Sequence, residues 1–529
     1  MAALDCSKSD FETALEHLEA SLNTNRQNNK AYILKAVILK HQGYKQAALS
    51  LLTELLKTDP LDQWAKFEVA ALSGQYDGFI QSSRNDAQTI IDIAFDYAEA
   101  GFYKEALAVI QLHHNNEIQQ CAVPNPMAKS VMTEFVLDWL YERNGDSVAA
   151  AEILKLTKAA SCDYFFPSRL SEQLVLEWVL QIDPQNTVAA FGLGNYYFNL
   201  KRHQEAIRVW KGAVAAHSNY ATLYRNLGIA YWNTFEDGEK ARQSFLKAVE
   251  LAPNDMRIRY EFDQLRKKLN DEPKDRLASL LPIIDQIITR DDFSVELAAL
   301  YNFTGDYHKA LNLLENKRFH PWEGGEGQVL RQFTYACLKL GQQALLEGDA
   351  ETALDFFMKS MNTPDNLGEK YHPLQAVAHI NYWKGLAQKV LGRTEEATAH
   401  FMASTNEEGD FIDMAVSTYS ELSYYKALSL KELGKVGEAN DLLAKIKGFA
   451  ETKLKEKAQI DYFATSLPLL LVFDDDMQKR NTMDAKFLIA LAELGMGNNS
   501  KALNLFEEVI QINAMHIGAH DQIISMRKT

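Results

Sequence analysis

The chain has 529 residues, of which 47% are hydrophobic, and its formal net charge is −16 at pH 7. This apolar content is typical of a folded protein rather than a disordered one, and the negative charge argues against nucleic acid or an anionic membrane as the main partner. No apolar run approaches the ~20 residues that span a bilayer, and the four cysteines have neither disulfide-framework nor metal-site spacing. We therefore expect a protein of the reducing cytosol with no metal, cofactor, membrane or nucleic-acid partner.

The start of the chain resembles an incomplete helix hairpin. Residues 11–25 carry Ala14, Leu18 and Ser21 at the spacing of a hairpin's second helix, and only a few residues before Asp10 remain for the first. Arrays of repeated hairpins normally begin with a complete polar-faced cap. We therefore expect Met1 to lie inside a repeat, so that the chain is a piece of a larger protein or docks on another chain here.

Further hairpins follow in the first third of the sequence. Residues 30–60 have Gly43 at the turn and Ala48 as the small contact residue, and residues 86–113 repeat this arrangement around Gly101. Glycine and proline breaks separate these segments from the helices that follow. The pattern predicts consecutive helix pairs rather than strands.

Residues 186–253 contain two successive copies of one pattern. Leu193-Gly194 recurs as Leu227-Gly228, an offset of 34 residues. The positions that recur one residue later, after a longer turn, are Ala206, Trp210 and Ala213, which become Ala241, Phe245 and Ala248. This period and order of residue types is the tetratricopeptide signature, in which small residues lie where the two helices approach most closely and aromatic residues fill the gap to the next hairpin. The chain thus resembles the tetratricopeptide-repeat superfamily.

The second half continues the pattern, with two unusual loops at residues 318–327 and 364–372 and a less regular segment at 461–468. Roughly a dozen hairpins and no strand-like alternation predict an all-α fold, a right-handed superhelical solenoid. We divide this one continuous solenoid into repeats 1–120, 121–317 and 318–529.

Polar residues are expected along the concave wall of the solenoid, because tetratricopeptide folds line that wall with the first helix of each hairpin. Amide side chains both donate and accept hydrogen bonds, which suits a peptide backbone or sugar hydroxyls. The alternative is a solvated face that must be polar in any case. Alignment on the turn glycines places these residues on the wall: Asn195, Asn199, Arg225, Asn233, Asn302, Gln342, Tyr382 and Lys389.

The loop at 318–327 is longer than most connections between helices, and long loops are often functional. An aromatic ring beside two carboxylates is typical of sites that bind or cleave sugars. The alternative is a turn whose tryptophan fills a gap between hairpins. The candidate binding residues of the two loops are His320, Trp322, Glu323 and Glu326, with Asn366, Glu369 and His372.

Other short motifs predict no chemistry. His516 and His520 have metal-ligand spacing, but Gly518 lies between them and the glutamate of a zincin motif is absent, so we interpret them as a surface pair. Gly495-Met496-Gly497 follows a helix and is expected to be a hairpin turn rather than a dinucleotide loop. The acidic run at residues 474–476 lacks the spacing of a calcium loop and is expected to be solvated or to cap a helix.

The strings His-Pro-Trp-Glu-Gly-Gly-Glu-Gly at 320–327 and Asn-Leu-Gly-Glu at 366–369, with residues 461–468, resemble one group of large bacterial proteins of unassigned function. In that group a β-rich half, similar to the sandwich domains of carbohydrate-active enzymes, precedes a tetratricopeptide half. The similarity covers nearly the whole of this chain, as the second half. It implies a sugar-related role and supplies no catalytic residues.

Three functions follow as hypotheses. The first is a non-enzymatic scaffold that docks a protein partner, most directly a β-sandwich domain, with a glycan as a further candidate ligand. The alternative is half of a carbohydrate-active, glycoside-processing enzyme, whose loop carboxylates complete a site shared with the sandwich half. The third is a peptide-binding adaptor that recognises an extended tail, with Arg225 pairing a carboxylate.

Overall fold

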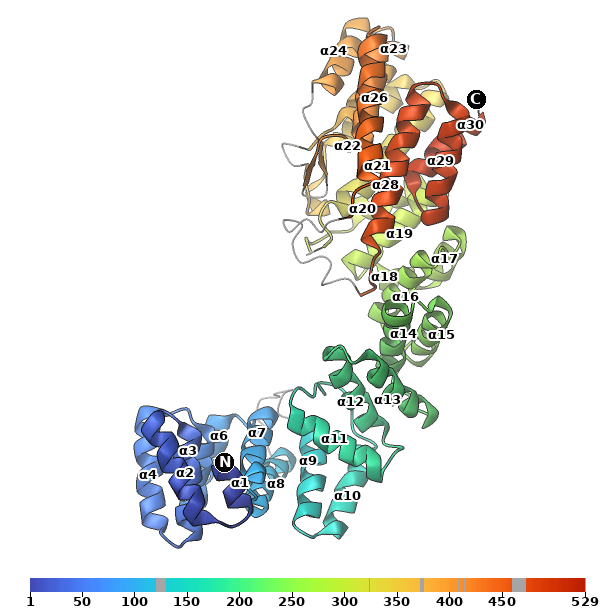
Figure 1. Ribbon diagram of the computed structural model, residues 1–529. Helices are drawn as coiled ribbons and strands as arrows, with labels where there is room; N and C mark the ends of the chain where they lie inside the picture. Colours follow the sequence, from blue (N-terminus) through green and yellow to red (C-terminus); the bar gives the residue numbers. More distant parts are fainter. Residues whose placement is uncertain are drawn as a thin grey trace. The chain divides into compact units, whose positions relative to one another are not determined.

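A computed structural model describes residues 1–119, 130–322, 324–371, 375–406, 410–412, 415–458 and 472–528 of the chain (Figure 1). The chain folds as two compact units, Met1–Leu223 and Tyr224–Thr529. Both consist of packed helix hairpins of the tetratricopeptide type, which confirms the predicted all-α class. The grouping of the repeats into 1–120, 121–317 and 318–529 stays a prediction.

Unit 1 is a succession of helices whose neighbours in sequence pack together, such as α3 on α4, α7 on α8, α9 on α10 and α12 on α13. Its helices are α1 (Ala2–Ser7), α2 (Phe11–Thr24), α3 (Asn29–His41), α4 (Lys45–Thr58), α5 (Gln63–Ser73), α6 (Asp77–Ser83), α7 (Ala87–Glu99), α8 (Tyr103–Gln119), α9 (Val131–Arg143), α10 (Ser147–Thr157), α11 (Leu170–Ile182), α12 (Thr187–Asn199) and α13 (His203–Ala215).

Unit 2 begins within α14 (Ala221–Phe235). It continues with α15 (Gly238–Leu251), α16 (Met256–Lys268), α17 (Pro273–Leu280), η1 (Leu281–Ile283), α18 (Ile284–Ile287), α19 (Asp291–Thr304), α20 (Tyr307–Asn316), α21 (Gln328–Leu346), α22 (Ala350–Met361), η2 (Asp365–Leu367), α23 (Ala378–Val390) and α24 (Thr394–Thr405). After the strands β1 (Asp410–Ile412) and β2 (Ala415–Ser417) come α25 (Glu421–Glu432), α26 (Val436–Lys453), α28 (Met477–Gly495), α29 (Asn499–Ile512) and α30 (Ile517–Lys528).

The two strands correct the expectation that the chain contains none. β1 and β2 pair antiparallel between α24 and α25, with Asp410 opposite Ser417 and Ile412 opposite Ala415. A strand of three residues is too short to produce a recognisable alternation of apolar and polar side chains. The pairing was therefore invisible in the sequence, and it leaves the fold class unchanged.

Local sequence signals explain where many helices begin. Aspartate or asparagine precedes the first turn and accepts a hydrogen bond from a backbone N–H that has no partner within the helix. Asp62 accepts from the N–H of Ala65 at 2.9 Å, and Asn186 accepts from Ala189 at 3.0 Å. Such caps recur at the starts of both first and second helices, so the hairpin boundaries are encoded locally.

Glycines in the first helix of four hairpins lie against an aromatic ring of the second helix. The pairs are Gly194 with Trp210, Gly228 with Phe245, Gly341 with Phe357 and Gly385 with Phe401. A Cβ atom on Gly341 would lie 2.4 Å from Cε1 of Phe357, closer than any real contact. The predicted close approach of small residues is thus confirmed, and the aromatic partner lies within the same hairpin. Phe245 also stacks on Phe262 of the next hairpin, at 6.1 Å between ring centroids.

Gly341→Ala is expected to destabilise unit 2 by about 1–3 kcal/mol, because the added methyl group overpacks the contact with Phe357. Gly448→Ala is the matched control, since Gly448 is exposed on α26 and a Cβ there meets nothing within 4 Å. The control should be neutral or stabilising by up to about 1 kcal/mol, as alanine is the better helix former. Urea unfolding followed by circular dichroism compares the two, and equal stabilities would contradict the packing argument.

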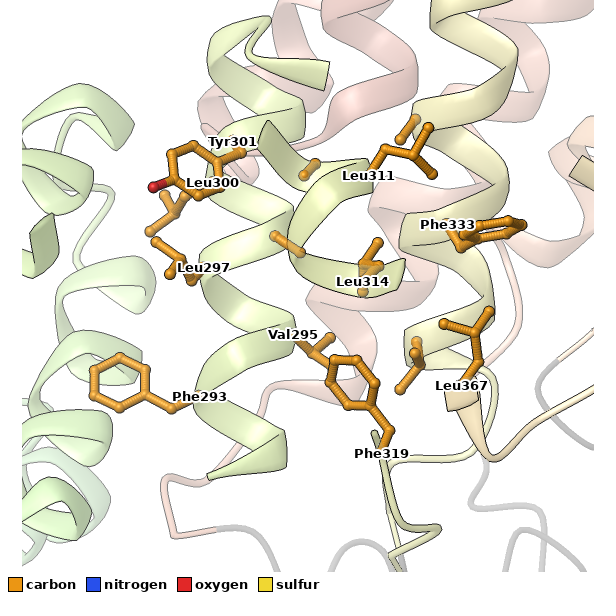
Figure 2. Packing of buried hydrophobic residues seen from close by; sticks show 14 of the residues in the cluster. Phe293, Val295, Leu297, Leu300, Tyr301, Leu311, Leu314, Phe319, Phe333 and Leu367 are labelled. Carbon is orange, nitrogen blue, oxygen red and sulfur yellow. The ribbon is translucent and has the colours of Figure 1, made fainter. Parts of the chain in front are cut away.

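A hydrophobic cluster in unit 2 joins α19, α20 and α21 to both unusual loops. Figure 2 shows Phe319 of the first loop and Leu367 of the second directed into the same cluster as Val295, Leu314 and Phe333. Phe319 is 2% exposed and Leu367 is 1% exposed. Both loops are therefore anchored by buried apolar side chains.

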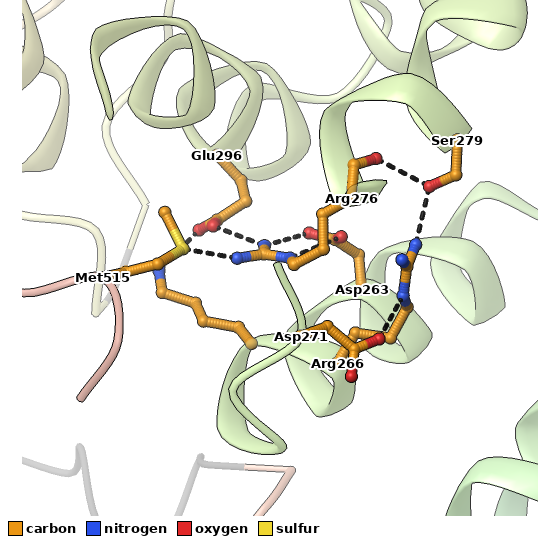
Figure 3. A network of polar contacts seen from close by, with 8 residues as sticks. Asp263, Arg266, Asp271, Arg276, Ser279, Glu296 and Met515 are labelled. Carbon is orange, nitrogen blue, oxygen red and sulfur yellow. Dashed lines mark hydrogen bonds and ion pairs between the residues drawn. The ribbon is translucent and has the colours of Figure 1, made fainter. Parts of the chain in front are cut away.

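A buried charge network holds α16, α17 and α19 together (Figure 3). The guanidinium of Arg276, which is fully buried, donates to both oxygens of Asp263 at 3.0 and 2.6 Å and to Oε1 of Glu296 at 2.8 Å. Lys267 pairs with the other oxygen of Glu296 at 2.8 Å. The network is thus fully partnered at its centre, which a buried charge requires.

The last helix of unit 2 contacts α19 and α21 through side chains. Asp521 of α30 accepts a hydrogen bond from Tyr335 at 2.9 Å and pairs with Lys339 at 3.0 Å. These two residues share a helix face with Gln342, which the sequence places on the inner wall. On α21, two residues of this helix face therefore contact α30 of the same chain.

The remaining short motifs are structural. His516 and His520 are both half-buried rather than on the surface: the ring of His516 lies 4.4 Å from that of Phe487, and His520 lies 4.8 Å from Phe303. Burial lowers the pKa of His516 to about 4. Gly497, with φ of 87°, forms the expected turn between α28 and α29. Asp476 caps α28 by accepting from the N–H of Lys479 at 2.9 Å.

Candidate functional site

The two unusual loops lie next to each other and are joined through their backbones. The N–H of Phe319 donates to the carbonyl oxygen of Asn366 at 2.7 Å. The side chain of Asn366 donates in turn to the carbonyl oxygens of Leu314 and Lys317, at 2.8 and 2.7 Å, which close the end of α20. A Cβ on Gly368, where φ is 71°, would lie 2.8 Å from the oxygen of Phe319, so only glycine fits there.

Glu369 caps α21 from the second loop. Its carboxylate accepts hydrogen bonds from the N–H groups of Gly327, at 2.8 Å, and Leu330, at 3.2 Å. A carboxylate at a helix N-terminus satisfies unpartnered N–H groups and meets the positive end of the helix dipole. One oxygen of Glu369 is therefore engaged by the end of the first loop and the other by the first turn of α21.

The other predicted loop residues differ in exposure. The indole of Trp322 lies over Gly325, where a Cβ would come within 2.0 Å of the ring, and it packs against the hydrophobic cluster. The side chain of His320 is 73% exposed beside Asp291, and Glu326 is exposed and accepts from the N–H of Gly324 at 2.9 Å. Glu323 and His372 lie outside the described residues. Binding of a ligand by these loops stays a prediction.

Two of the predicted wall residues, Arg225 and Asn302, form contacts within unit 2. Arg225 pairs with Glu261 through two hydrogen bonds, at 2.5 and 2.6 Å, so its guanidinium already has a carboxylate partner. The amide of Asn302 donates to the backbone and side-chain oxygens of Gln332 at 3.0 and 2.9 Å. These residues therefore link neighbouring helices.

Tyr382 and Asn195 are two further residues that the sequence places on the concave wall. The ring of Tyr382 lies 5.7 Å from that of Tyr425 and 5.4 Å from that of Trp383, and burial raises the pKa of its hydroxyl. Asn195 is half-buried on α12 of unit 1. The structure therefore brings the two loops together.

Asn233, also placed on the wall by the sequence, binds a short segment of the chain's own backbone. Its Nδ2 donates to the carbonyl oxygen of Val472 at 3.0 Å, and its Oδ1 accepts from the N–H of Asp474 at 2.9 Å. The amide thus contacts the main chain on both sides of Phe473. This is the use that the sequence analysis gave for amides on the wall.

The residues around Asn233 complete a contact surface that the sequence analysis did not identify. Phe473, 3% exposed, packs against Trp232 and Phe245 with ring centroids 6.3 and 5.7 Å apart. Asp475 lies 3.4 Å from Nζ of Lys268. We call Trp232, Asn233, Phe245 and Lys268 the docking site. The signal in the sequence is an acidic run directly after an aromatic residue, which the sequence analysis expects to be solvated or to cap a helix.

The described part of the chain carries neither a metal-binding cluster nor a helix that could span a membrane. It contains no group of three or more histidine, cysteine, aspartate or glutamate side chains able to hold a metal ion. None of its described helices combines the length and apolarity needed to cross a bilayer.

Comparison with known proteins identifies repeats in the region that carries the docking site. The tetratricopeptide repeat family model matches residues 176–255, which include α14 and its Asn233. Among solved structures, yeast Tom70 is 11% identical over 100% of this chain and 93% of its own, with a TM-score of 0.29. YrrB, described as a tetratricopeptide protein with an unusual peptide-binding site, is 16% identical over 47% of this chain and 98% of its own, with a TM-score of 0.18. The human IFIT1 dimer with m7Gppp-AAAA is 13% identical over 91% of this chain and 90% of its own, with a TM-score of 0.23.

Proposed function

We propose, starting from the tetratricopeptide repeats that this chain carries at residues 176–255, that the protein is an interaction scaffold that binds an extended segment of a protein partner. The observation that supports this proposal is the two-point hydrogen bonding of Asn233 to the backbone of residues 472–474. An amide that donates to one peptide group and accepts from another recognises extended main chain whatever its side chains. A first-helix residue of the repeat thus already performs the contact that peptide recognition needs.

The experiment that tests this function is a binding screen against an array of unstructured octapeptides. Fluorescence polarisation compares four proteins. They are the full chain, the Phe473→Ala variant, and each of these two with Asn233→Ala added. Loss of two hydrogen bonds of ordinary strength is expected to weaken binding at least tenfold. Gln243→Ala is the matched control, because Gln243 is an exposed amide on α15 of the same repeat, bonded to Glu239 at 2.9 Å.

Two outcomes decide the proposal. The proposal is supported by peptides that bind the proteins in which Asn233 is intact, including the Gln243→Ala control. The same peptides must fail to bind the Asn233→Ala variants. If no peptide binds either the wild-type chain or the folded Phe473→Ala variant, the chain is not a peptide-binding scaffold of this kind.

The finer hypothesis, that the partner is a β-sandwich domain in a sugar-related bacterial system, depends only on the resemblance of the two loops. In this hypothesis His320 and Glu326, the predicted binding residues with exposed side chains in the described part of the loops, would meet the partner or a glycan. The alternative, half of a glycoside-processing enzyme, would need Glu369 to exchange its two backbone hydrogen bonds for a role toward substrate. We therefore favour the scaffold.

A further inference from the structure

The docking site is occupied by the chain's own residues 472–475, and each contact identifies a chemical feature of what it accepts. The amide of Asn233 contacts main-chain atoms only. It therefore fixes the register of the bound segment and does not select its side chains. The indole N–H of Trp232 extends this register by donating to the carbonyl oxygen of Asp474 at 3.4 Å. Asp474 therefore contributes its main-chain N–H and oxygen, while its side chain is exposed.

The position before Asp474 selects an aromatic side chain. Phe473 is almost fully buried between Trp232 of α14 and Phe245 of α15, and its ring is steeply inclined to both, at 81° and 55°. The edge-to-face contact with Trp232 adds to the free energy gained by burying the ring. A small or charged residue at this position would leave the apolar surface of both rings unfilled.

The position after Asp474 selects an acidic side chain. Asp475 lies 3.4 Å from Lys268, and Lys268 ends α16 in a turn that also contains Arg266 and Lys267. Arg266 is bonded to Asp271 and Lys267 to Glu296, so Lys268 is the cation of that turn that faces Asp475. Asp475 also pairs with Arg480 of its own segment at 2.5 Å. A partner segment would contribute the carboxylate without Arg480, so the carboxylate would pair with Lys268.

We propose that the docking site recognises an aromatic residue followed two positions later by an acidic residue, in an extended segment of a partner protein, and that residues 473–475 of the chain hold the site as an internal competitor. This inference depends on the proposed function and names the partner's chemistry. A segment tethered in the same chain acts at an effective concentration in the millimolar range. A partner with the same pattern must therefore bind with higher intrinsic affinity, or at more than one point, to displace it.

The test uses a fluorescein-labelled peptide of residues 472–477, Val-Phe-Asp-Asp-Asp-Met, as the probe. It is titrated against the full chain, the Phe473→Ala chain, and the Phe473→Ala chain that also carries Asn233→Ala. We expect the Phe473→Ala chain to bind the probe at least tenfold more tightly than wild type, because its own segment competes poorly. The additional Asn233→Ala substitution should abolish that gain.

Matched peptides test the pattern position by position. Replacing the phenylalanine by alanine, or the acid that corresponds to Asp475 by asparagine, should weaken binding, whereas the same change at Asp474 should leave it unaltered. Because Phe473 is buried, circular dichroism first establishes that the variant chain is folded. Asp475→Asn in the full chain is a second receptor with the core intact, and it should bind the probe a few-fold more tightly than wild type.

The outcomes separate this inference from the proposed function. The inference is wrong if the probe binds the wild-type and variant chains with equal affinity. It is also wrong if a variant chain binds array peptides that lack the pattern as tightly as it binds the probe. Either result leaves the proposed scaffold function intact. If neither the probe nor any array peptide binds a folded variant, both the inference and the proposed function are wrong.

Discussion

Arg276→Met is expected to lower the free energy of unfolding of unit 2 by about 3–5 kcal/mol, because it leaves two buried carboxylates without their shared cation. Asp263 loses both of its hydrogen bonds to the guanidinium, and Glu296 retains only Lys267. Methionine approximates the length of the arginine stem, so the loss comes from charge rather than from a cavity. Urea unfolding gives the size of the effect, and hydrogen exchange in α16, α17 and α19 localises it.

Arg257→Met is the control for this substitution. The side chain of Arg257 is 63% exposed and pairs with Glu261 one helical turn away at 3.0 Å. Glu261 is buried but keeps its two hydrogen bonds to Arg225, and an arginine this exposed contributes about 0–1 kcal/mol, so the control should be nearly neutral. If the two variants unfold at the same urea concentration, the buried network does not stabilise the fold as argued.

The effect of Arg276→Met should also depend on pH. Burial by itself raises the pKa of Glu296, but Lys267 and Arg276 outweigh it and lower the pKa to about 2. A carboxyl with a lowered folded pKa stabilises the fold above its unfolded pKa of about 4.3, and this contribution disappears as the pH falls toward 2. The stability difference between wild type and variant should therefore be largest above about pH 5 and narrow in acid. A constant difference from pH 7 to pH 3 would contradict the electrostatic origin.

Phe319→Ala is expected to lower the free energy of unfolding of unit 2 by about 3–5 kcal/mol, the usual range when a buried aromatic side chain is removed. Phe319 is the residue that holds the first unusual loop in the cluster of Figure 2, next to Leu367 of the second loop. Without the ring, both loops lose their shared apolar anchor. Faster hydrogen exchange in residues 318–327 and 364–369, together with a lower midpoint in urea, is the expected result.

His320→Ala tests the same loop without touching its core. The His320 side chain is 73% exposed, and its ring lies 3.1 Å from Asp291, while the backbone bond to that carboxylate survives the substitution. The change in stability should be below about 1 kcal/mol. A stability loss equal to that of Phe319→Ala would mean that the loop is held by its polar contacts and not by the buried ring.

Most of the fold was encoded in signals that act over a few residues. A glycine of the first helix and an aromatic residue of the second recur together in four hairpins, and aspartate or asparagine caps begin many helices, so the hairpins could be recognised without coordinates. Gly341 and Phe357 illustrate why: their contact lies within one hairpin and depends on residue size and spacing alone. The short β1–β2 pair had no such signal.

Local sequence patterns could predict where the site residues lie but not what they contact. Their position on a loop or a helix face follows from spacing, and so the two glycine-containing loops and the amide of Asn233 could be singled out. What each side chain contacts depends on segments far away in the sequence. Glu369 caps a helix that begins 41 residues before it, and Asn233 meets Asp474, which lies 241 residues after it.

The sequence by itself therefore determined the repeated helix hairpin, since that unit is stabilised by contacts between neighbours in the chain. Only the tertiary structure decided what covers the faces that the hairpins leave open, because those contacts close over long stretches of chain and carry no periodic signal. Asp475 shows the difference most clearly. In the sequence it is one of three consecutive acids, and in the folded chain it is the one that reaches Lys268 while Phe473 fills the space between Trp232 and Phe245.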